Sequence, residues 1–509
     1  MGAFDAIKIN KADNTATVLR DIKAGDEVRV SAEGTILSVI AQQDIAFGHK
    51  IALSEMQPGT SLLKYGEVMG DATQNIHRGE LVHVHNADSN RGRGDLHGDC
   101  NAVQSPRVKG REELTLHEPF IDLSNFTFEG YVRGDGSVGT RNLVGVFSSV
   151  VCANDIVCEC SDIAEAAVFT HQQGCSQTSV DVRRVESVLI NLAANPNLGA
   201  VVVVGLGCES VRTPWVVEQI RATGKPVEYI CIQQEGGKAE AVSKVRAKVL
   251  ELAAGLNPKK TVCGVDKLRV GLKCGSSDTT QGVSANPVIG LITEALAAAG
   301  AQVVIGETTE FMGAEHIAAQ HAKSQEVADA IVARVADMER RARAVGVDMR
   351  GGQPTRGNIA GGLTTIEEKS LGALAKAGSA VFRDVVDYGQ RSQEHGLVMM
   401  DAPGREPEML TGLAASGCNL VLFATGRGAP QGFPFVPVIK ITGNERTASM
   451  MHEHIDCDVS AVIRGEDSLE SAAEKVWRFV RVVLAGELTK AEKCRYFGAM
   501  NIYTTGPTI

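Results

Sequence analysis

The feature that most constrains the fold is an uninterrupted apolar run that ends in a glycine-containing turn, AVVVVGLG from Ala200. Strands with one face in water usually alternate apolar and polar residues, whereas a short run that is apolar throughout is typical of a strand covered by helices on both faces. A second run, LVGVFSSVV from Leu143, has the same character. The chain therefore predicts a largely parallel sheet between two layers of helices.

The same pattern of strands and helices continues to the C-terminus. Candidate strands from Leu268 onward read LRVGLK, AQVVIG, GLVMM, NLVLFATG and VPVIKITG, and they alternate with helical segments such as PVIGLITEALAAAG. A further segment, SQEVADAIVARVADMERRARAVG, is amphipathic and highly charged, which places it on the surface. We predict two α/β domains, residues 127–264 and 265–509, the second with a mostly parallel sheet.

The N-terminal segment has a different pattern. From Ile7 to about His85 it consists of short apolar stretches separated by glycine-containing turns, which predicts a small β domain at residues 1–93. Residues 94–126 begin as a polar, glycine-containing stretch without apolar periodicity and are predicted to be a linker. A chain of 509 residues exceeds what one hydrophobic core supports, so this division into several domains is expected.

Composition excludes several classes of protein. The net charge is −10, only 4% of residues are aromatic, and no block of basic residues is present, so we expect no nucleic-acid partner. We also expect no membrane insertion and no secretory signal, hence a cytoplasmic protein. In that compartment the 12 cysteines act as metal ligands or small buried residues, because thiols there stay reduced.

Polar and sulfur-containing side chains follow many of the predicted strands. In open α/β sheets, ligands bind beyond the carboxyl ends of the strands, so these positions have more functional weight than others. They are occupied by Cys152, Cys208, Glu209, Cys274, Ser276, Ser277, Asp278, Glu307, Glu310, Asp401 and Arg427. Packing alone does not account for so many polar groups at strand ends.

A metal site is one interpretation of these groups. His171 and Cys175 are four residues apart, so they share a face if the segment is helical, and an imidazole with a thiolate suits Fe²⁺ or Zn²⁺. The alternative is a satisfied buried histidine beside an inert thiol. Cys152, Cys208 and Glu209 could converge on the same crevice. We therefore take Cys152, Cys175, Cys208 and Glu209 as metal-ligand candidates.

Two histidines stand near the end of the predicted β domain, in the segment HVHN. In a strand, His83 and His85 would point to the same side, with Asn86 directly after them. Two neutral imidazoles could serve as a base and its helper or as metal ligands. The alternative is the exposed face of an edge strand, which has the same pattern.

Three arginines are candidates for holding a carboxylate. Arg133 and Arg141 flank the glycine-rich segment GDGSVG, which lacks the lysine of a phosphate-binding loop and precedes a strand instead of following one. Arg427 lies among glycines, where backbone can approach a ligand closely. Each could clamp a carboxylate in a bidentate manner, and each could equally be a surface arginine.

Long segments of this chain together resemble the altronate and galactarate dehydratase family. They are GHKIALSEMQPGTSLLKYGEVMG with HVHN, GYVRGDGSVGTRN, the TH and GC of residues 170–175, GLGCES, SANPVIG, NIAGGLTTIEEKSLG and DAPGREPEMLTGLAASGCNLVLFATGRG. The resemblance implies an N-terminal β-clip domain of the SAF type, a middle α/β domain that forms a dimer contact, and a Rossmann-like C-terminal domain. It also implies dehydration of a sugar acid with a divalent metal, Fe²⁺ or Mn²⁺.

The resemblance leads to a hypothesis about mechanism. A base removes the proton at C2 of a small anionic hydroxy acid, the 3-hydroxyl leaves with a proton, and a 2-keto-3-deoxy acid results. We expect His83, His85 and His171 to be the catalytic groups. Asn86, Arg133, Arg141 and Arg427 would bind the substrate.

Other functions stay open at this point. The segment NADSNRGRGD departs from the altronate enzymes, and its Arg91 and Arg93 are compatible with a sulfonate or a second carboxylate, or with solvated arginines. A sulfo-lyase that releases sulfite from a sulfolactate-like acid would share the same framework. An NAD-dependent oxidoreductase lacks its glycine motif after a strand, and a non-catalytic sugar-acid sensor would keep the fold without the chemistry.

Overall fold

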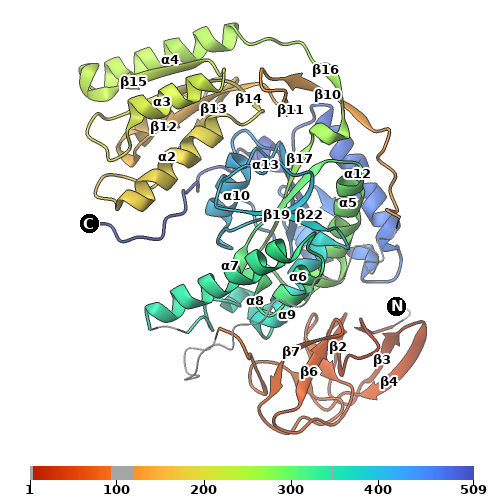
Figure 1. The fold of residues 1–509 in the computed structure, drawn as a ribbon. Helices are drawn as coiled ribbons and strands as arrows, with labels where there is room; N and C mark the ends of the chain where they lie inside the picture. The colour runs from red at the N-terminus through yellow and green to blue at the C-terminus, as the bar shows by residue number, and fades with distance from the viewer. Residues whose placement is uncertain (1–3, 93–117, 347) are drawn as a thin grey trace.

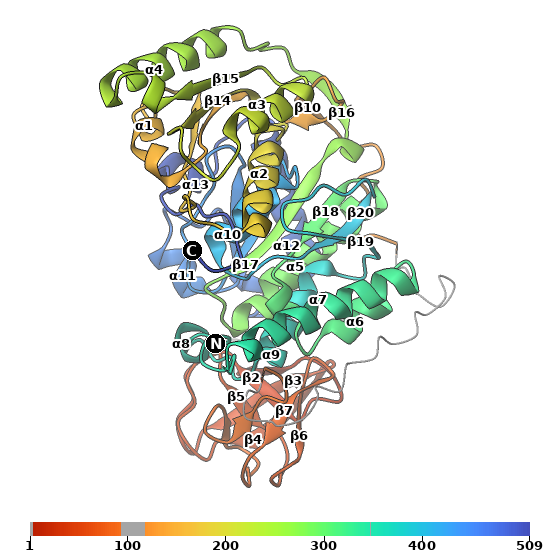
Figure 2. The ribbon, with the colours of Figure 1, turned by 60° about the vertical axis from the view of Figure 1, so that its left-hand side comes forward.

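The computed structural model describes residues 4–92, 118–346 and 348–509. Both views show an N-terminal part (residues 4–92) at one end of the molecule and a middle part (residues 118–264) at the other. A C-terminal part (residues 265–509) lies between them (Figures 1 and 2). Most of the predicted linker, residues 94–117, falls outside the described residues, and the predicted domain boundaries stay a prediction.

The N-terminal part is built from short strands in two sheets, as its turn-rich sequence predicts. The six-stranded sheet has the order β4-β3-β1-β2-β5-β8, and the three-stranded sheet has the order β6-β7-β9. The strands are β1 (Ala6–Lys8), β2 (Thr15–Val18), β3 (Glu27–Ala32), β4 (Thr35–Ile40), β5 (Lys50–Ala52), β6 (Ser61–Lys64), β7 (Glu67–Ala72), β8 (Leu81–Val82) and β9 (Ala87–Asp88). In β3, buried and more exposed residues alternate, because only one face of the strand meets the core.

The middle part contains a four-stranded parallel sheet of order β13-β12-β14-β15 and a three-stranded antiparallel sheet of order β11-β10-β16. The strands are β10 (Thr127–Val132), β11 (Val138–Gly139), β12 (Leu143–Ser148), β13 (Ala166–Phe169), β14 (Leu198–Gly205), β15 (Val227–Cys231) and β16 (Thr261–Gly264). The helices are η1 (Val151–Ala153), α1 (Asn154–Cys158), α2 (Ser179–Ala193), α3 (Thr213–Ala222), η2 (Ile232–Gln234) and α4 (Lys238–Ala254).

The C-terminal part contains a seven-stranded parallel sheet of order β19-β20-β18-β17-β21-β22-β23. Its strands are β17 (Arg269–Gly275), β18 (Gln302–Ile305), β19 (Phe382–Val386), β20 (Gly396–Met400), β21 (Leu420–Thr425), β22 (Val438–Thr442) and β23 (Cys457–Asp458). Its helices are η3 (Val265–Lys267), η4 (Gln281–Ala285), α5 (Asn286–Ala298), η5 (Thr308–Phe311), α6 (Glu315–Gln320), α7 (Gln325–Ala344), α8 (Arg356–Ala360), α9 (Ile366–Leu374), η6 (Ala375–Ala377), α10 (Glu406–Ala415), α11 (Glu445–Met450), η7 (Ser460–Val462), α12 (Leu469–Leu484) and α13 (Lys490–Cys494).

The apolar run from Ala200 lies in a strand that is buried on both faces. In β14, Val201 and Val203 belong to one hydrophobic cluster, whereas Val202 and Val204 belong to another on the opposite face of the sheet. The first of these clusters also contains Phe423 of β21 and Leu413 of α10. The middle and C-terminal parts therefore share one core, in which α2 packs against α10.

The α/β architecture with a small β-rich N-terminal part and a parallel C-terminal sheet confirms the predicted fold class. Two local conformations considered for the sequence do not occur in the structure. His83 to Asn86 form a turn closed by a hydrogen bond from Asn86 N to His83 O, because strand β8 ends at Val82. Residues 170–175 are irregular and not helical. Among the described residues, no helix is both long and apolar enough to cross a membrane.

Candidate active-site cleft

A cleft of about 500 Å³ lies where the N-terminal part faces the carboxyl ends of three strands in the seven-stranded sheet. The N-terminal part contributes the loop before β5, including Phe47 and His49. The sheet contributes residues that follow β17, β21 and β22, namely Asp278, Arg427, Asn444 and Arg446. The carboxyl edge of a parallel sheet is where α/β folds place their ligands, so this cleft is the candidate active site.

Glycines allow the backbone of the N-terminal part to contact the backbone of the C-terminal part beside the cleft. Gly48 has a φ of +81° and Gly362 a φ of +95°, which side chains other than glycine rarely adopt. A Cβ atom on Gly362 would lie 2.2 Å from the backbone oxygen of Gly48, and one on Gly48 would lie 3.3 Å from that of Gly361. Backbone therefore meets backbone at this point, and the contact fixes His49 directly over the cleft.

His49 has the geometry of a base. Its Nδ1 lies 3.3 Å from the backbone oxygen of Phe47, and since a carbonyl can only accept, Nδ1 donates and Nε2 keeps its lone pair. Burial, assisted by the charge of Lys50, lowers the pKa of His49. The imidazole is therefore neutral at neutral pH, in the form that can remove a proton.

His83 stands behind His49. The two ring centroids are 4.8 Å apart in an edge-to-face arrangement, and His83 Nδ1 lies 3.3 Å from Thr364 Oγ1. Burial, followed by the charges of Lys50 and His49, lowers the pKa of His83 to about 4. His83 is thus a second neutral ring that packs against the first and fixes its orientation.

A buried ion-pair cluster fastens the N-terminal part to α9 next to these rings. Lys50 Nζ donates to Glu368 Oε2 at 2.8 Å and to the backbone oxygen of Gly362 at 2.7 Å, and Lys64 Nζ donates to Glu368 Oε1 at 2.7 Å. None of these side chains is more than 2% exposed. Burial by itself would raise the pKa of Glu368, but the two lysines lower it to about 2, so the carboxylate stays charged.

The far wall of the cleft carries the cations. Arg427 Nη1 donates to the backbone oxygen of Gly357 at 2.7 Å, and the residue is otherwise exposed. Arg446, at the start of α11, is also exposed and forms no ion pair within the described residues. In a chain with a net charge of −10, two such guanidinium groups provide the local attraction that an anionic ligand needs.

Asp278 lies between these walls. Its Oδ1 accepts hydrogen bonds from the backbone and hydroxyl of Thr280, and its Oδ2 accepts one from Asn444 Nδ2 at 2.8 Å. Burial is the largest influence and raises the pKa of this carboxyl despite those donors. A Cβ on Gly426 would lie 2.3 Å from the carboxyl carbon, so glycine is required where the loop after β21 passes it.

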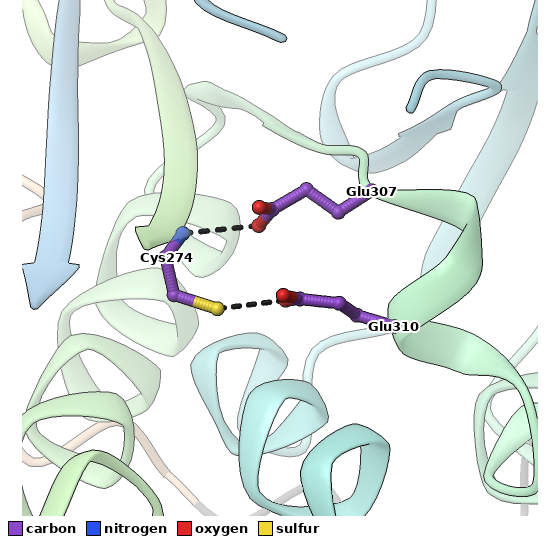
Figure 3. Close-up of side chains that lie close together, drawn as sticks. All are labelled: Cys274, Glu307 and Glu310. Atoms are coloured by element: carbon purple, nitrogen blue, oxygen red, sulfur yellow. Dashed lines mark hydrogen bonds between the residues drawn. The ribbon is translucent and has the colours of Figure 1, made fainter. Parts of the chain in front are cut away.

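Below the cleft, Cys274, Glu307 and Glu310 form a candidate metal-binding group (Figure 3). Cys274 N donates to Glu307 Oε2 at 3.0 Å, and its thiol donates to Glu310 Oε2 at 2.7 Å. Burial, and then the two carboxylates, raise the pKa of this thiol. Within the described residues, no other set of three histidine, cysteine or acidic side chains brings its ligand atoms this close together.

Lysines already occupy this group, which decides whether a metal fits. Lys376 Nζ lies 2.8 Å from Cys274 Sγ and 3.0 Å from Glu307 Oε2, and Lys369 Nζ lies 3.2 Å from Glu310 Oε1. Lys273 also contacts Glu307. Three ammonium groups more than balance two carboxylates, so a divalent cation would add repulsion to a buried site. In this arrangement the donors do not fit a metal ion.

The other predicted groups of the HVHN segment have different surroundings from His83. His85 is exposed on the turn, and its backbone oxygen accepts a hydrogen bond from Gln74 Nε2 at 2.9 Å. Asn86 uses its side chain to hold the turn, because Oδ1 accepts from His83 N and Nδ2 donates to Leu81 O. Its amide is therefore committed to protein atoms and is not presented to the cleft.

The predicted metal ligands lie at the carboxyl edge of the middle sheet. Cys152 follows β12, Cys175 follows β13, and Cys208 and Glu209 follow β14. The three cysteines are exposed, whereas Glu209 accepts hydrogen bonds from Ser149, Thr213 and Gly207 N. This edge belongs to the part of the molecule opposite the N-terminal part (Figure 1), so within one chain these groups do not join His83.

His171 matches the alternative interpretation, a satisfied buried histidine. Its Nε2 donates to the backbone oxygen of Ser148 at 3.0 Å, and its Nδ1 accepts from Gln173 N at 3.1 Å. Burial lowers the pKa of the ring to about 4. Both nitrogens are used by backbone groups, so the contacts of this residue do not support a catalytic role.

Two of the three predicted clamp arginines hold the protein itself together. Arg141 donates from all three side-chain nitrogens, to Glu492 and to the backbone oxygens of Thr140, Val483 and Glu487. Arg133 donates to the backbone oxygens of Pro196 and Arg141 and to Asn142 Oδ1. Only Arg427 of the three lines the cleft.

The basic segment after the histidines is also engaged. Arg91 pairs with Glu315 and with Glu339, the latter at 3.1 Å, and these contacts fasten the end of the N-terminal part to α6 and α7. Arg93 lies outside the described residues. Arg91 is therefore an anchor between parts of the fold, and its contacts do not support a role as a ligand for a second anionic group.

Sequence reasoning missed His49, Arg446 and Asn444. His49 is a single histidine in a loop, and no spacing to a second ligand identifies it. Arg446 and Asn444 follow β22, and applying the strand-end criterion to that strand would have found them. His49 emerges only when the N-terminal part is placed against the sheet.

Three family models match successive stretches of the chain. "Altronate/galactarate dehydratase SAF domain" covers residues 4–90, and "D-galactarate dehydratase/Altronate hydrolase, second domain" covers residues 130–257. "D-galactarate/Altronate dehydratase, C-terminal" covers residues 265–508. Nearly all of the described chain is thus accounted for by models of one family.

Individual proteins are similar as well. Altronate dehydratase of Bacillus subtilis (strain 168) is 34% identical over 520 residues, which cover 99% of both chains. Galactarate dehydratase (L-threo-forming) of Escherichia coli (strain K12) is 30% identical, over 94% of this chain and 93% of its own. In Chromohalobacter salexigens, (2R)-sulfolactate sulfo-lyase has a beta subunit that is 38% identical over 73% of this chain and 96% of its own. Its alpha subunit is 29% identical over 16% of this chain and 93% of its own.

Proposed function

This chain belongs to the altronate/galactarate dehydratase family and is a hydro-lyase, and from that premise we propose that it dehydrates a sugar acid of the altronate or galactarate type in the cleft beneath the N-terminal part. The product is a 2-keto-3-deoxy acid. One observation carries the placement: the cleft brings the neutral imidazole of His49 opposite the guanidinium groups of Arg427 and Arg446. A base facing two cations is what removal of a proton next to a carboxylate requires.

The arginines bind and activate the substrate. A sugar acid enters with its carboxylate toward Arg427 and Arg446, which offer planar donors suited to a carboxylate. When the proton at C2 is removed, negative charge spreads from C2 onto the carboxylate oxygens. The same guanidinium groups then stabilise that charge more strongly than they stabilise the ground state, which lowers the barrier.

His49 removes the proton from C2. Its Nε2 carries the lone pair, and His83 packed behind the ring keeps the imidazole directed into the cleft. The lowered pKa of His49 favours the unprotonated form of the base. General-base catalysis of this kind contributes roughly 10²–10⁴-fold to the rate.

The second proton transfer goes to the leaving hydroxyl at C3. Asp278 is the candidate acid, because burial raises its pKa and it lines the same cleft. Proton delivery lets the hydroxyl depart as water, and the resulting enol becomes the 2-keto acid. The atoms balance, because the substrate loses one water in total. When the enol becomes the keto acid, C3 gains one proton and the enol hydroxyl releases one, which restores the base and the acid to their starting states.

A divalent metal, Fe²⁺ first and Mn²⁺ second, is part of the proposal through the resemblance alone. A bound divalent ion would supply Lewis-acid stabilisation of the enediolate. The lysine-filled group of Cys274, Glu307 and Glu310 does not fit it, so none of the steps above depends on a metal. Elemental analysis of the purified enzyme, before and after EDTA, decides whether a metal resides in the protein.

A substrate panel tests the reaction. The enzyme, with and without added Fe²⁺ or Mn²⁺, is incubated with altronate, galactarate, other aldonates and aldarates, and sulfolactate, and the mixtures are assayed separately for keto acid and sulfite. Keto acid from an aldonate or aldarate, with no sulfite from sulfolactate, supports the proposal. Turnover of none of the sugar acids would contradict it.

A sulfo-lyase is the second candidate function. The observation in its favour is the 38% identity to a sulfo-lyase beta subunit. The alpha subunit of the same enzyme matches a stretch about as long as the N-terminal part of this chain, which agrees with a cleft formed between two separable pieces. Release of sulfite from sulfolactate in the panel would favour this function over dehydration.

The small anionic substrate, the absence of nucleic-acid and membrane partners, and the cytoplasmic location belong to the proposal as well. So does a homodimer. Light scattering of the purified enzyme gives its mass and tests the last of these points directly.

A further inference from the structure

A second cavity lies at the opposite edge of the seven-stranded sheet, where its strands begin. It measures about 360 Å³. Arg269, Gln302 and Asn419, at the starts of β17, β18 and β21, form part of its wall, and the turn of residues 135–137 between β10 and β11 forms another part. That turn belongs to the glycine-rich segment GDGSVG, to which the proposed reaction gives no role.

Two arginines of this wall lie close together. A Cβ on Gly417 would lie 3.4 Å from Arg269 Nη1 and 3.4 Å from Arg391 Nε, so the two guanidinium groups converge on one point. Within the described residues neither forms an ion pair. Arg269 donates over a long 3.5 Å to Ser416 O, and Arg391 Nη2 donates to Asn191 O at 3.2 Å. Two like charges held together in this way repel each other.

Arg391 is also incompletely hydrogen bonded. Its Nε is buried and has no hydrogen-bond partner among the residues that the structure describes, which is a costly state for a cationic donor. Burial, and then the charge of Arg269, lower the pKa of Arg391 to about 10. Native structures keep few such groups without a partner.

Of the two acidic residues near the cavity, Asp135 acts electrostatically on Arg391 but forms no ion pair with it within the described residues. Asp266 pairs with Lys267 at 3.1 Å, and Asp135 accepts from the backbone and hydroxyl of Ser137 within its own turn. Three basic side chains, Lys267, Arg269 and Arg391, and two acidic ones, Asp135 and Asp266, line the cavity. His395 also lines it, but its Nδ1 donates to Gly300 O, so it is counted here as a neutral ring. The cavity has one positive charge in excess.

We propose that this cavity is a second ligand site, which binds a small oxyanion, a carboxylate or phosphate group, between Arg269 and Arg391. The bound anion contacts both the turn of the middle part and the first residues of the C-terminal sheet, so it fastens these two parts to each other. The site is at the opposite edge of the sheet from the cleft, so a ligand here regulates stability or activity without competing with substrate. This inference does not depend on which acid the enzyme dehydrates.

Anion titration of the full-length enzyme tests the site. Pyruvate and inorganic phosphate are titrated separately by calorimetry, with chloride at equal ionic strength as the control for screening. Saturable binding of pyruvate alone identifies a carboxylate ligand, and saturable binding of phosphate alone identifies a phosphate ligand. If neither anion binds saturably, or if chloride gives the same response, the proposal is overturned.

Variants locate the binding. Arg391→Met and Arg269→Met each remove one guanidinium, and each is expected to weaken the bound anion by about tenfold or more. Arg391→Lys keeps the charge but loses the planar donors, so it guards against loss of folding. Arg221→Met, in a surface pair with Glu218 on α3, is the control and is expected to keep the binding. Unchanged affinity in both the Arg391 and the Arg269 variants would place the anion elsewhere and contradict the proposal.

Discussion

The two parallel sheets of this chain end in similar chemistry but different surroundings. At the carboxyl edge of the middle sheet, Cys152, Cys175 and Cys208 are exposed to solvent. At the carboxyl edge of the C-terminal sheet, Asp278 is buried, and the N-terminal part lies over the edge with His49 (Figure 2). The three cysteines of the first edge are open to solvent, whereas the N-terminal part covers the second edge at the cleft.

The difference shows what turns a strand end into a site. Both edges satisfy the rule that ligands bind beyond the carboxyl ends of parallel strands. At the edge that the N-terminal part covers, burial lowers the pKa of His49 and raises that of Asp278. Water exclusion also strengthens the electrostatic interactions on which charge stabilisation depends. Substitutions at the covered edge should therefore change activity or stability more than substitutions of the exposed cysteines at the other edge.

The largest effect is expected at His49. Replacing it by Gln removes the base while keeping a polar side chain, so kcat should fall by roughly 10²–10⁴-fold. Because burial lowers the pKa of His49, the native enzyme should keep its activity at pH values below the ordinary pKa of histidine and lose it only when His49 becomes protonated at lower pH. The residual activity of the variant should not show this loss at low pH. Steady-state kinetics across pH measure both. His85→Ala, on the exposed turn, is the control, and equal losses in both variants would refute the role of His49.

The next effect is expected at the buried ion-pair cluster of Lys50, Lys64 and Glu368. Glu368→Gln leaves Lys50 and Lys64 buried without a counter-charge, which costs about 3–5 kcal/mol and should lower the urea midpoint at neutral pH. The folded-state pKa of Glu368 is lowered to about 2 from 4.5, so its contribution is complete above pH 4.5 and disappears as the pH falls toward 2. The difference between native and variant should shrink over that range.

Glu55→Gln is the matched control for the buried ion-pair cluster. Glu55 pairs with His77 at 2.7 Å, but both side chains are exposed, so the urea midpoint should hardly move. If Glu368→Gln changes stability no more than Glu55→Gln, the N-terminal part is not fastened to the sheet through this cluster.

A smaller effect is expected at the cationic wall. Arg427→Met removes charged hydrogen bonds to the substrate carboxylate, worth about 1.5–3 kcal/mol, so kcat/KM should fall roughly tenfold to a hundredfold. Arg221→Met, in a surface pair with Glu218 on α3, is the control and should keep native kinetics. If Arg427→Met lowers kcat/KM for the amide of the substrate as much as for the acid, Arg427 does not act by binding the carboxylate.

The smallest effect is expected at the open edge. In a combined variant with Cys152, Cys175 and Cys208 replaced by Ser, three exposed side chains change little in size, so stability should stay within about 0.5 kcal/mol per site. Turnover and bound metal should also be unchanged. If this variant loses its activity and its metal together, these cysteines are the metal ligands that the sequence predicts, and the cleft is not the whole site.

Part of the candidate site could be read from the sequence. Arg427 and Asp278 follow apolar strands, so the position of strand ends is enough to select them. His83 was selected for a wrong reason, since it lies in a turn and not on a strand, yet it packs behind the base. His49, Arg141 and His171 could not be assigned, because nothing local distinguishes an imidazole over a cleft from one bonded to backbone, or a free guanidinium from a satisfied one.

The sequence by itself determined the architecture. Apolar runs such as that of β14 can be stable only as strands covered on both faces, and alternation in β3 fixes a sheet with one face in water. The tertiary structure alone decided which sheet edge is covered. That choice depends on contacts far apart in the chain, the backbone of Gly48 against Gly362 and the ammonium of Lys50 against Glu368. Burial at this contact sets the protonation of His49, because the charged form of a group is destabilised wherever water is excluded.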